Sequence, residues 1–198
     1  MHMKTLVTIT LVIFHIEEDA LYVFLKNKCL LSAIISETAT LEEQVEEIFS
    51  KNIGAPIGNN YVEQLYTISP SNNEITIVYY VLLADTKNRE SIIQHWEKVT
   101  SKHFSEKQII SYALQRLRWK IEYTNVVYSL LPKTFTLSDL QKTYEIILGQ
   151  KLDKRNFRKK ILSLKFLKPT GEKRTINSRP AQMYTFIKRT PQIVKVFS

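Results

Sequence analysis

The sequence predicts an α+β protein, with a front domain of mixed strands and helices followed by a C-terminal winged helix-turn-helix domain. Two observations carry this prediction. In the first hundred residues, β-branched and aromatic runs surround one amphipathic helical segment. Near the C-terminus, two helical segments precede two short strand-like runs. A length of 198 residues suits one large or two small domains. We place the domains at residues 1–102 and 103–198.

The front domain shows strand-like runs on both sides of a helical segment at 41–51. This segment places apolar residues at helical spacing on one face and four glutamates on the other. From about Lys87 to Pro132 the pattern becomes helical again, with a long helix expected over 105–131. The expected strands are residues 6–14, 20–25, 29–35, 61–69 and 74–84.

Residues 135–166 predict two helices joined by a tight turn. Ser138 is the expected N-cap of the first helix, and Gly149 is its expected C-terminal glycine. Asp153 is expected to cap the second helix. The apolar stripe of the first helix comprises Leu140, Tyr144, Ile147 and Leu148; that of the second comprises Phe157, Ile161, Leu162 and Leu164.

Outside its apolar stripe, the second helix carries side chains that are typical of a helix that binds nucleic acid. Arginine and asparagine bind purine edges in a major groove, and lysine binds phosphates. We therefore assign Arg155, Asn156 and Arg158 to base edges and Lys154 and Lys159 to phosphates. Thr136 and Ser138, at the start of the first helix, complete the expected DNA-contacting residues of the two helices.

A basic hairpin is predicted directly after the two helices. Residues 166–168 and 183–187 are expected strands, and residues 169–171 start a turn. The loop expected over 172–180 contains Lys173, Arg174 and Arg179, which we expect to contact the DNA backbone or a minor groove. Helix, turn, helix and basic hairpin is the order of elements in a winged helix. A basic helical hairpin with no ligand is the alternative.

The charge distribution supports a polyanion-binding C-terminal domain. From Lys133 onward there are 16 basic and 4 acidic residues, a net charge of +12. The preceding residues contain 12 basic and 15 acidic residues, a net charge of −3. A basic third joined to an acidic remainder points to a nucleic-acid partner. The basic helix lacks the wide aromatic and leucine-rich face of a membrane-surface helix, so we expect no membrane partner.

The composition argues against a disulfide-rich, metal-binding, membrane-spanning or secreted protein. The single Cys29 excludes an internal disulfide framework and a cysteine zinc cluster. The four histidines form no recognisable catalytic or metal-binding pattern, and we expect no cofactor and no metal. The apolar run at residues 6–14 is too short to span a bilayer. No signal peptide is evident, and we expect a cytoplasmic protein.

The chain resembles the Nudix-related transcriptional regulators (NrtR-like), in which a Nudix-type domain is fused to a winged helix. The segments LSDLQKTYEIILG and LDKRNFRKKIL carry the resemblance most specifically. The resemblance is close over residues 103–187 and looser over residues 4–84. In the looser part, the helix in TLEEQVEEIFSKNIG corresponds to the Nudix helix.

The Nudix box implied by this resemblance is degenerate. Aligned on Gly54, its opening glycine falls on Ala33 and its first glutamate on Ala39. A later glutamate falls on Ile48, and the paired glutamates fall on Lys51 and Asn52. Nudix cleavage of a pyrophosphate needs carboxylates that hold Mg²⁺. We therefore expect no hydrolysis, and Lys51 favours an anionic ligand if a pocket remains. The alternative metal-binding set on this helix is Glu42, Glu43, Glu46 and Glu47.

The resemblance implies a sequence-specific DNA-binding regulator that forms a homodimer on a palindromic operator in double-stranded DNA. It also implies an effector such as ADP-ribose, another nucleotide sugar or a sugar. The main alternative is an active Nudix-type pyrophosphatase with an accessory nucleic-acid-binding domain. An RNA-binding or scaffold protein is a third interpretation. We expect the aromatic residues of the helix at 105–131 to help pair two chains: Tyr112, Trp119, Tyr123 and Tyr128.

Overall fold

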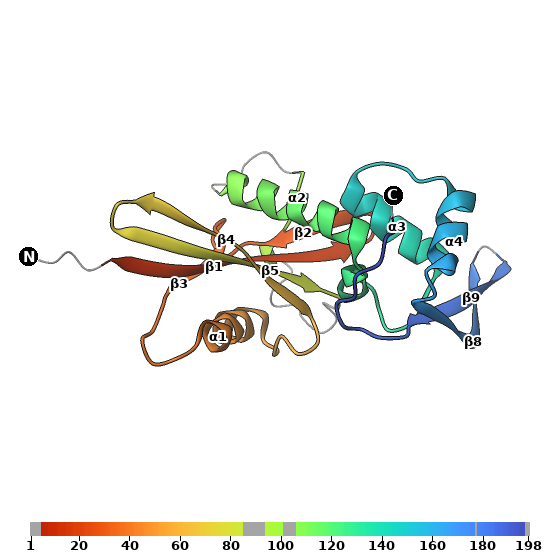
Figure 1. The fold of residues 1–198 in the computed structure, drawn as a ribbon, viewed down its shortest axis with the longest axis horizontal. Coiled ribbons are helices and arrows are strands. Elements are labelled where there is room, and N and C mark those ends of the chain that lie inside the picture. The colour runs from red at the N-terminus through yellow and green to blue at the C-terminus, as the bar shows by residue number, and fades with distance from the viewer. Residues whose placement is uncertain (1–4, 85–93, 101–105, 177, 197–198) are drawn as a thin grey trace, which may run out of the picture.

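The computed structural model describes residues 5–84, 94–100, 106–176 and 178–196. A sheet covered by helices forms one end of the molecule, and a small helical domain with a β-hairpin forms the other (Figure 1). The front elements are β1 (Leu6–Glu17), β2 (Ala20–Phe24), β3 (Leu31–Ile34), α1 (Leu41–Ile53), β4 (Tyr61–Ser71), β5 (Glu74–Leu83) and β6 (Trp96–Lys98). The later elements are α2 (Lys107–Tyr123), the 3₁₀ helix η2 (Val126–Leu130), β7 (Phe135–Thr136), α3 (Leu137–Leu148), α4 (Lys154–Ser163), β8 (Leu167–Ile176) and β9 (Arg179–Phe186).

The front sheet is mixed and is built around β1. Its strand order is β4-β5-β1-β2-β6, and β3 also pairs with β1. β1 runs parallel to β5, with Val12 opposite Tyr80, whereas its pairings with β2 and β3 are antiparallel. The five strands expected before residue 85 and the helix expected at 41–51 are thus confirmed.

Helices cover both faces of this sheet, with α1 on one side and α2 on the other (Figure 1). Alternate residues of β1 supply the two faces because successive side chains of a strand point in opposite directions. Leu11 and Ile13 pack in the cluster that contains α1, and Val12 and Phe14 pack in the cluster that contains α2. All four side chains are fully buried.

The prediction of a helical pattern from about Lys87 to Pro132 was partly wrong. Residues 96–98 form β6, which pairs with β2, and the Trp96 ring packs against Phe24 at 5.3 Å between centroids. These contacts with distant residues favour a strand over a helix. Residues 85–93 and 101–105 lie outside the described ranges.

The helix expected over 105–131 is in fact interrupted. α2 ends at Tyr123, Thr124 is extended, and η2 follows. The fully buried Asn125 explains the break: its Oδ1 accepts from the Gln192 amide (2.7 Å) and its Nδ2 donates to the Thr190 carbonyl (3.1 Å). The C-terminal segment therefore holds the chain in a turn at this point.

The winged helix contains α3, α4 and a three-stranded sheet in the order β7-β9-β8. Its core is continuous with the α2 side of the front sheet. One cluster of buried residues includes Tyr80 of β5, Leu117 of α2, Tyr144 of α3 and Phe157 of α4. The boundary predicted between residues 102 and 103 falls outside the described residues, and it stays a prediction. Within the described ranges, no helix combines the length and the apolar character needed to cross a membrane.

Candidate nucleic-acid interface

The first helix of the pair, α3, begins two residues earlier than the sequence predicted. Thr136 rather than Ser138 is its N-cap: the Thr136 hydroxyl accepts from the Asp139 amide (3.2 Å), and the Asp139 carboxylate accepts from the Thr136 amide (2.8 Å). This reciprocal capping box satisfies two amides that a helix otherwise leaves unpaired. Gly149 ends the helix in the left-handed conformation (φ 72°), as expected.

The turn between α3 and α4 is held by Glu145, a residue that the sequence analysis missed. Its carboxylate accepts from the Leu152 amide (3.0 Å), the Gln141 side chain (2.9 Å) and Lys151 (3.0 Å). The hydrogen bond from the Leu152 amide is the main reason that the pKa of Glu145 lies below its ordinary value. These bonds fix the angle at which α4 leaves α3.

The second helix, α4, presents a basic face to solvent. Asp153 caps it by accepting from the Asn156 amide (2.7 Å), and Phe157 and Ile161 face the core. Arg155, Asn156 and Lys159 are exposed, so three of the predicted base and phosphate contacts share the outward side of the helix.

Leu162 was wrongly predicted to be buried. Its side chain is 46% exposed, and helical spacing places it beside Arg155 and Lys159 on the outward face. The apolar stripe of α4 is narrow because a helix of ten residues offers the core only the positions near Phe157 and Ile161. Leu164, also expected in this stripe, is half-buried after the end of the helix.

The other predicted residues of the two helices take different positions. Arg158 is half-buried, and its guanidinium donates to the hydroxyl of Ser138 (3.1 Å), which places both beside the start of α3. Lys154 is exposed in the first turn of α4. Thr136 is 2% exposed, and its hydroxyl is used in the helix cap, so it lies apart from the outward residues.

The wing is a longer hairpin than the sequence predicted. The expected loop at 172–180 is mostly strand, because pairing resumes with Lys173 opposite Gln182 after an irregularity that follows Pro169. Gly171, with φ 83°, allows this irregularity. Proline and glycine therefore mark a bulge within the strand and not its end.

The three basic wing residues are all exposed, but one of them has a partner within the protein. The Arg174 guanidinium donates to both carboxylate oxygens of Asp139 (2.6 and 2.8 Å). Asp139 also caps α3, so this ion pair ties the wing to the start of the first helix. Lys173 and Arg179 lie on the same hairpin and have no ion-pair partner among the described residues.

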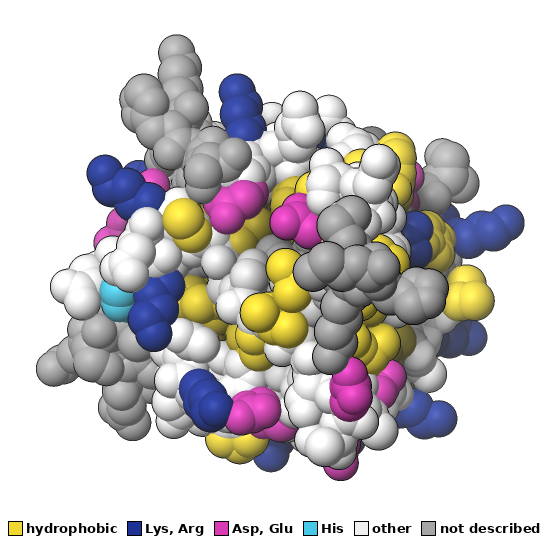
Figure 2. Space-filling view, turned by 90° about the vertical axis from the view of Figure 1, so that its left-hand side faces the viewer, with side chains coloured by type: hydrophobic (Ala, Val, Ile, Leu, Met, Phe, Trp, Pro, Cys, Tyr) yellow, Lys and Arg dark blue, Asp and Glu magenta, His cyan; other side chains and the backbone are white. Residues whose placement is uncertain are grey.

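Charge is distributed differently at the other end of the molecule. Figure 2 looks onto the end of the front domain that faces away from the winged helix. Lys and Arg side chains in that view lie scattered near the margin, beside Asp and Glu. The concentrated basic charge belongs to the part of the chain that begins at Lys133.

The degenerate Nudix box lies on α1 and the segments around it. Two of the glutamates named as an alternative metal-binding set serve the fold: Glu43 accepts from the Thr40 amide (2.8 Å) and Glu46 from the Ile57 amide (3.1 Å). Lys51 is exposed and forms an ion pair with Glu47. Within the described part of the chain, no three acidic, histidine or cysteine side chains gather in a way that could hold a metal ion.

Comparisons with known proteins agree with this arrangement. Residues 127–186 match the family model described as the NrtR DNA-binding winged helix domain. The ADPR responsive transcriptional repressor NtrR of Acinetobacter baylyi is 32% identical over 144 residues. The match covers 66% of this chain and 58% of that protein, so the chain spans less than two thirds of the relative's length.

Solved structures extend the similarity to the front domain. NrtR of Shewanella oneidensis, crystallised with a 27mer DNA, matches with a TM-score of 0.79 and 25% identity over 92% of this chain and 94% of that one. A MutT/nudix family protein from Enterococcus faecalis matches with a TM-score of 0.73 over 94% of this chain and 88% of that one; at 18% identity it shows the fold alone. Residues 127–186 therefore belong to the NrtR DNA-binding winged helix family, and most of the chain is similar in fold to NrtR of Shewanella oneidensis.

Proposed function

We propose that this protein is a sequence-specific transcriptional repressor that binds double-stranded DNA through α4 and the wing. The single observation that carries the proposal is the outward face of α4. Arg155, Asn156 and Lys159 are exposed there, on a helix fixed by the Asp153 cap and by the Glu145 bonds to the turn. An exposed basic helix of this kind fits a DNA major groove. The exposed Leu162 on the same face would contact a thymine methyl group.

The relatives support the regulatory part of the proposal. The Acinetobacter protein is named a transcriptional repressor, and the Shewanella protein was crystallised with DNA. Selection of bound sites from random duplex DNA tests the proposal on this chain. We expect a recurrent sequence to emerge. The proposal would be contradicted if the selection enriched no sequence. It would also be contradicted if RNA competed for the protein as well as duplex DNA does.

We propose that the protein acts as a homodimer in the cytoplasm, on an operator with two related halves. Two recognition helices then enter successive major grooves, with half-sites about 10 base pairs apart. The exposed face of α2 is the proposed pairing surface, because Tyr112, Trp119 and Tyr123 are 46%, 46% and 37% exposed. Tyr128, which was expected to join them, is only 3% exposed and packs against Phe186 in the winged helix.

We further propose that the Nudix-type domain binds an effector and does not hydrolyse it. The Acinetobacter relative is named as responsive to ADPR, which makes ADP-ribose the first effector to test. The box positions at Ala39, Ile48, Lys51 and Asn52 lack the carboxylates of the Nudix pattern. Without them, Mg²⁺ has no organised ligand set to activate water.

The purified protein is accordingly expected to show no Mg²⁺-dependent hydrolysis of ADP-ribose. Phosphate release, measured after treatment of the products with a phosphatase, should equal that of the buffer. Lys51→Glu should also be inactive, because one carboxylate does not restore the set. Turnover by the wild-type protein that disappears on chelation of Mg²⁺ would overturn this part of the proposal.

The wing is expected to bind DNA phosphates. Changing Lys173 and Arg179 together to alanine should reduce the slope of log K against log salt by about 0.9 for each phosphate that is no longer neutralised. A double alanine change at the exposed Lys26, after β2, and Lys107, at the start of α2, makes the same change in net charge and should leave the slope unaltered. If the two double variants behave alike in salt titrations, the wing does not bind DNA.

A further inference from the structure

The outer part of the wing, residues 173–182, has no core of its own. None of its described residues is buried. Pairing between the two strands is interrupted after Pro169 and resumes at Lys173, so β9 alone runs without a break from the inner to the outer part. Gly171 lies in the interruption, and a Cβ at this position would meet no atom within 4 Å. Side-chain packing therefore does not fix the direction of the outer wing.

An ion pair holds the outer wing to the start of α3. The Arg174 guanidinium donates to both carboxylate oxygens of Asp139 (2.6 and 2.8 Å). Within the described ranges, no other ion pair joins residues 173–182 to the rest of the protein. The Asp139 carboxylate is itself held in place, because it also accepts from the Thr136 amide in the capping box (2.8 Å). The outer wing is thus attached to a fixed point of the domain.

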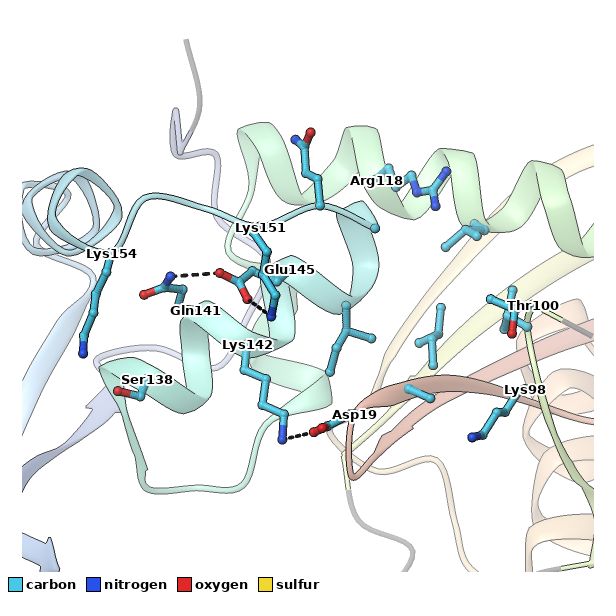
Figure 3. A pocket seen from close by; sticks show the side chains of 17 residues that line it. Asp19, Lys98, Thr100, Arg118, Ser138, Gln141, Lys142, Glu145, Lys151 and Lys154 are labelled. Atoms are coloured by element: carbon cyan, nitrogen blue, oxygen red, sulfur yellow. Dashed lines mark hydrogen bonds and ion pairs between the residues drawn. The ribbon is translucent and has the colours of Figure 1, made fainter. Parts of the chain in front are cut away.

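The recognition helix α4 is attached to the same point. The Arg158 guanidinium donates to the hydroxyl of Ser138 (3.1 Å), the residue that immediately precedes Asp139. The Nε of Arg158 is buried, so this side chain is directed into the protein. Ser138 and Lys154 both line the cavity drawn in Figure 3, where the Lys154 side chain extends from α4 towards the start of α3. Two consecutive residues of α3 therefore hold both α4 and the wing.

We propose that Asp139 is a positioning residue for DNA recognition, which sets the direction of the outer wing relative to α4 through Arg174. The inference rests on the proposed repressor function and adds to it the residue that aligns the two DNA-binding elements. Lys173 and Arg179 of the outer wing are the proposed phosphate contacts. They can bind DNA together with α4 only if the wing is held at the right angle, because a binding surface depends on the residues that lock its contacts in place.

The sign of the effect separates positioning from simple electrostatics. A carboxylate beside DNA repels phosphates, so its removal strengthens binding if charge alone acts. If Asp139 positions the wing, its removal weakens binding, because Lys173 and Arg179 lose their alignment with α4. The same change should also lower the salt dependence of binding, although no cation has been removed.

The test is a titration of the full chain with the selected duplex, followed by fluorescence anisotropy at several salt concentrations. Asp139→Asn keeps an oxygen for the Thr136 amide and loses the charge that holds Arg174. Its affinity should fall by about fivefold, the upper range for a partly exposed ion pair. Its slope of log K against log salt should approach that of the Lys173 and Arg179 double alanine variant. Arg174→Gln leaves the capping box intact and should show the same loss of affinity.

Glu172→Gln is the matched control. It removes one carboxylate from the same hairpin, and within the described ranges Glu172 takes part in no ion pair. This variant should bind the selected duplex at least as tightly as the wild type does. Asp139→Asn should have no further effect in the variant that already lacks Lys173 and Arg179, because it acts through them. A general folding defect would instead add to the loss in that variant.

Two results would overturn the inference. One is an Asp139→Asn protein that binds the selected duplex as tightly as the wild type or more tightly. The other is a loss from Asp139→Asn that adds in full to the loss from the wing double variant. Both leave a wild type that prefers its site, so the proposed repressor function stands. A wild type without sequence preference would contradict that function, and the inference would fall with it.

Discussion

Replacing Arg155 and Asn156 with alanine is expected to remove the preference of the protein for its selected DNA site. Each side chain is exposed on the outward face of α4, and a bidentate contact with a base contributes about 1–3 kcal/mol of discrimination. Removal of both side chains should therefore lower the ratio of specific to non-specific affinity by roughly a hundredfold or more. Alanine is a good helix former, so α4 should remain folded.

Lys159→Ala provides the contrast. Its predicted partner is a phosphate, so this change should weaken binding to selected and scrambled duplexes alike. Anisotropy titrations of both duplexes measure the two effects, and circular dichroism checks the fold. If the double variant keeps the wild-type ratio, α4 does not carry the base contacts.

Glu63→Ala is expected to cause the largest decrease in stability. Glu63 of β4 is 19% exposed and accepts from Tyr80 (2.6 Å), Tyr61 (2.8 Å), Arg116 (2.8 Å) and Lys120 (2.9 Å). The last two lie on α2, so one carboxylate joins the sheet to the helix that connects the domains. Its removal leaves two cations and two hydroxyls without their acceptor, which should cost about 3 kcal/mol of unfolding free energy.

The matched control is Glu47→Ala on α1. Within the described ranges, the one ion pair of Glu47 is with the exposed Lys51, and exposed pairs contribute about 0–1 kcal/mol. Urea unfolding of both variants measures the difference. Equal destabilisation by the two changes would show that the Glu63 network does not join the sheet to α2 in solution.

The same carboxylate predicts a pH dependence. Burial alone would raise the pKa of Glu63, but the four hydrogen bonds outweigh it and lower the pKa to about 2. An unfolded glutamate has a pKa near 4.3 and binds a proton first, so the stabilisation is complete above that pH and is lost as the pH falls towards about 2. The stability difference between wild type and Glu63→Gln should therefore shrink over this range. A difference that is constant from pH 5 to pH 2.5 would contradict the assignment.

Local signals in the sequence predicted most of the elements. These signals act within one or two turns of a helix. As predicted, Asp153 caps α4, Gly149 ends α3, and the apolar spacing of α3 buries Tyr144 and Ile147. The N-cap of α3 was misplaced because Thr136 and Ser138 are both good caps. Only the position of Asp139, three residues after Thr136, completes the capping box at the first of them.

Features that depend on contacts between residues far apart in the sequence could not be predicted from local patterns. β6 exists because it pairs with β2, and α2 ends where Asn125 bonds to the segment at Thr190 and Gln192. The Glu63 network likewise joins residues more than fifty positions apart.

The most direct measurement of the central claim is a comparison of two duplexes of equal length, one carrying the selected site and one carrying its scrambled sequence. The wild-type protein should bind the selected duplex at least about a thousandfold more tightly at physiological salt, the lower end for sequence-specific DNA-binding proteins. Both affinities should fall steeply as salt rises, because phosphate contacts contribute to each. Equal affinity for the two duplexes at every salt concentration would contradict sequence-specific recognition by α4.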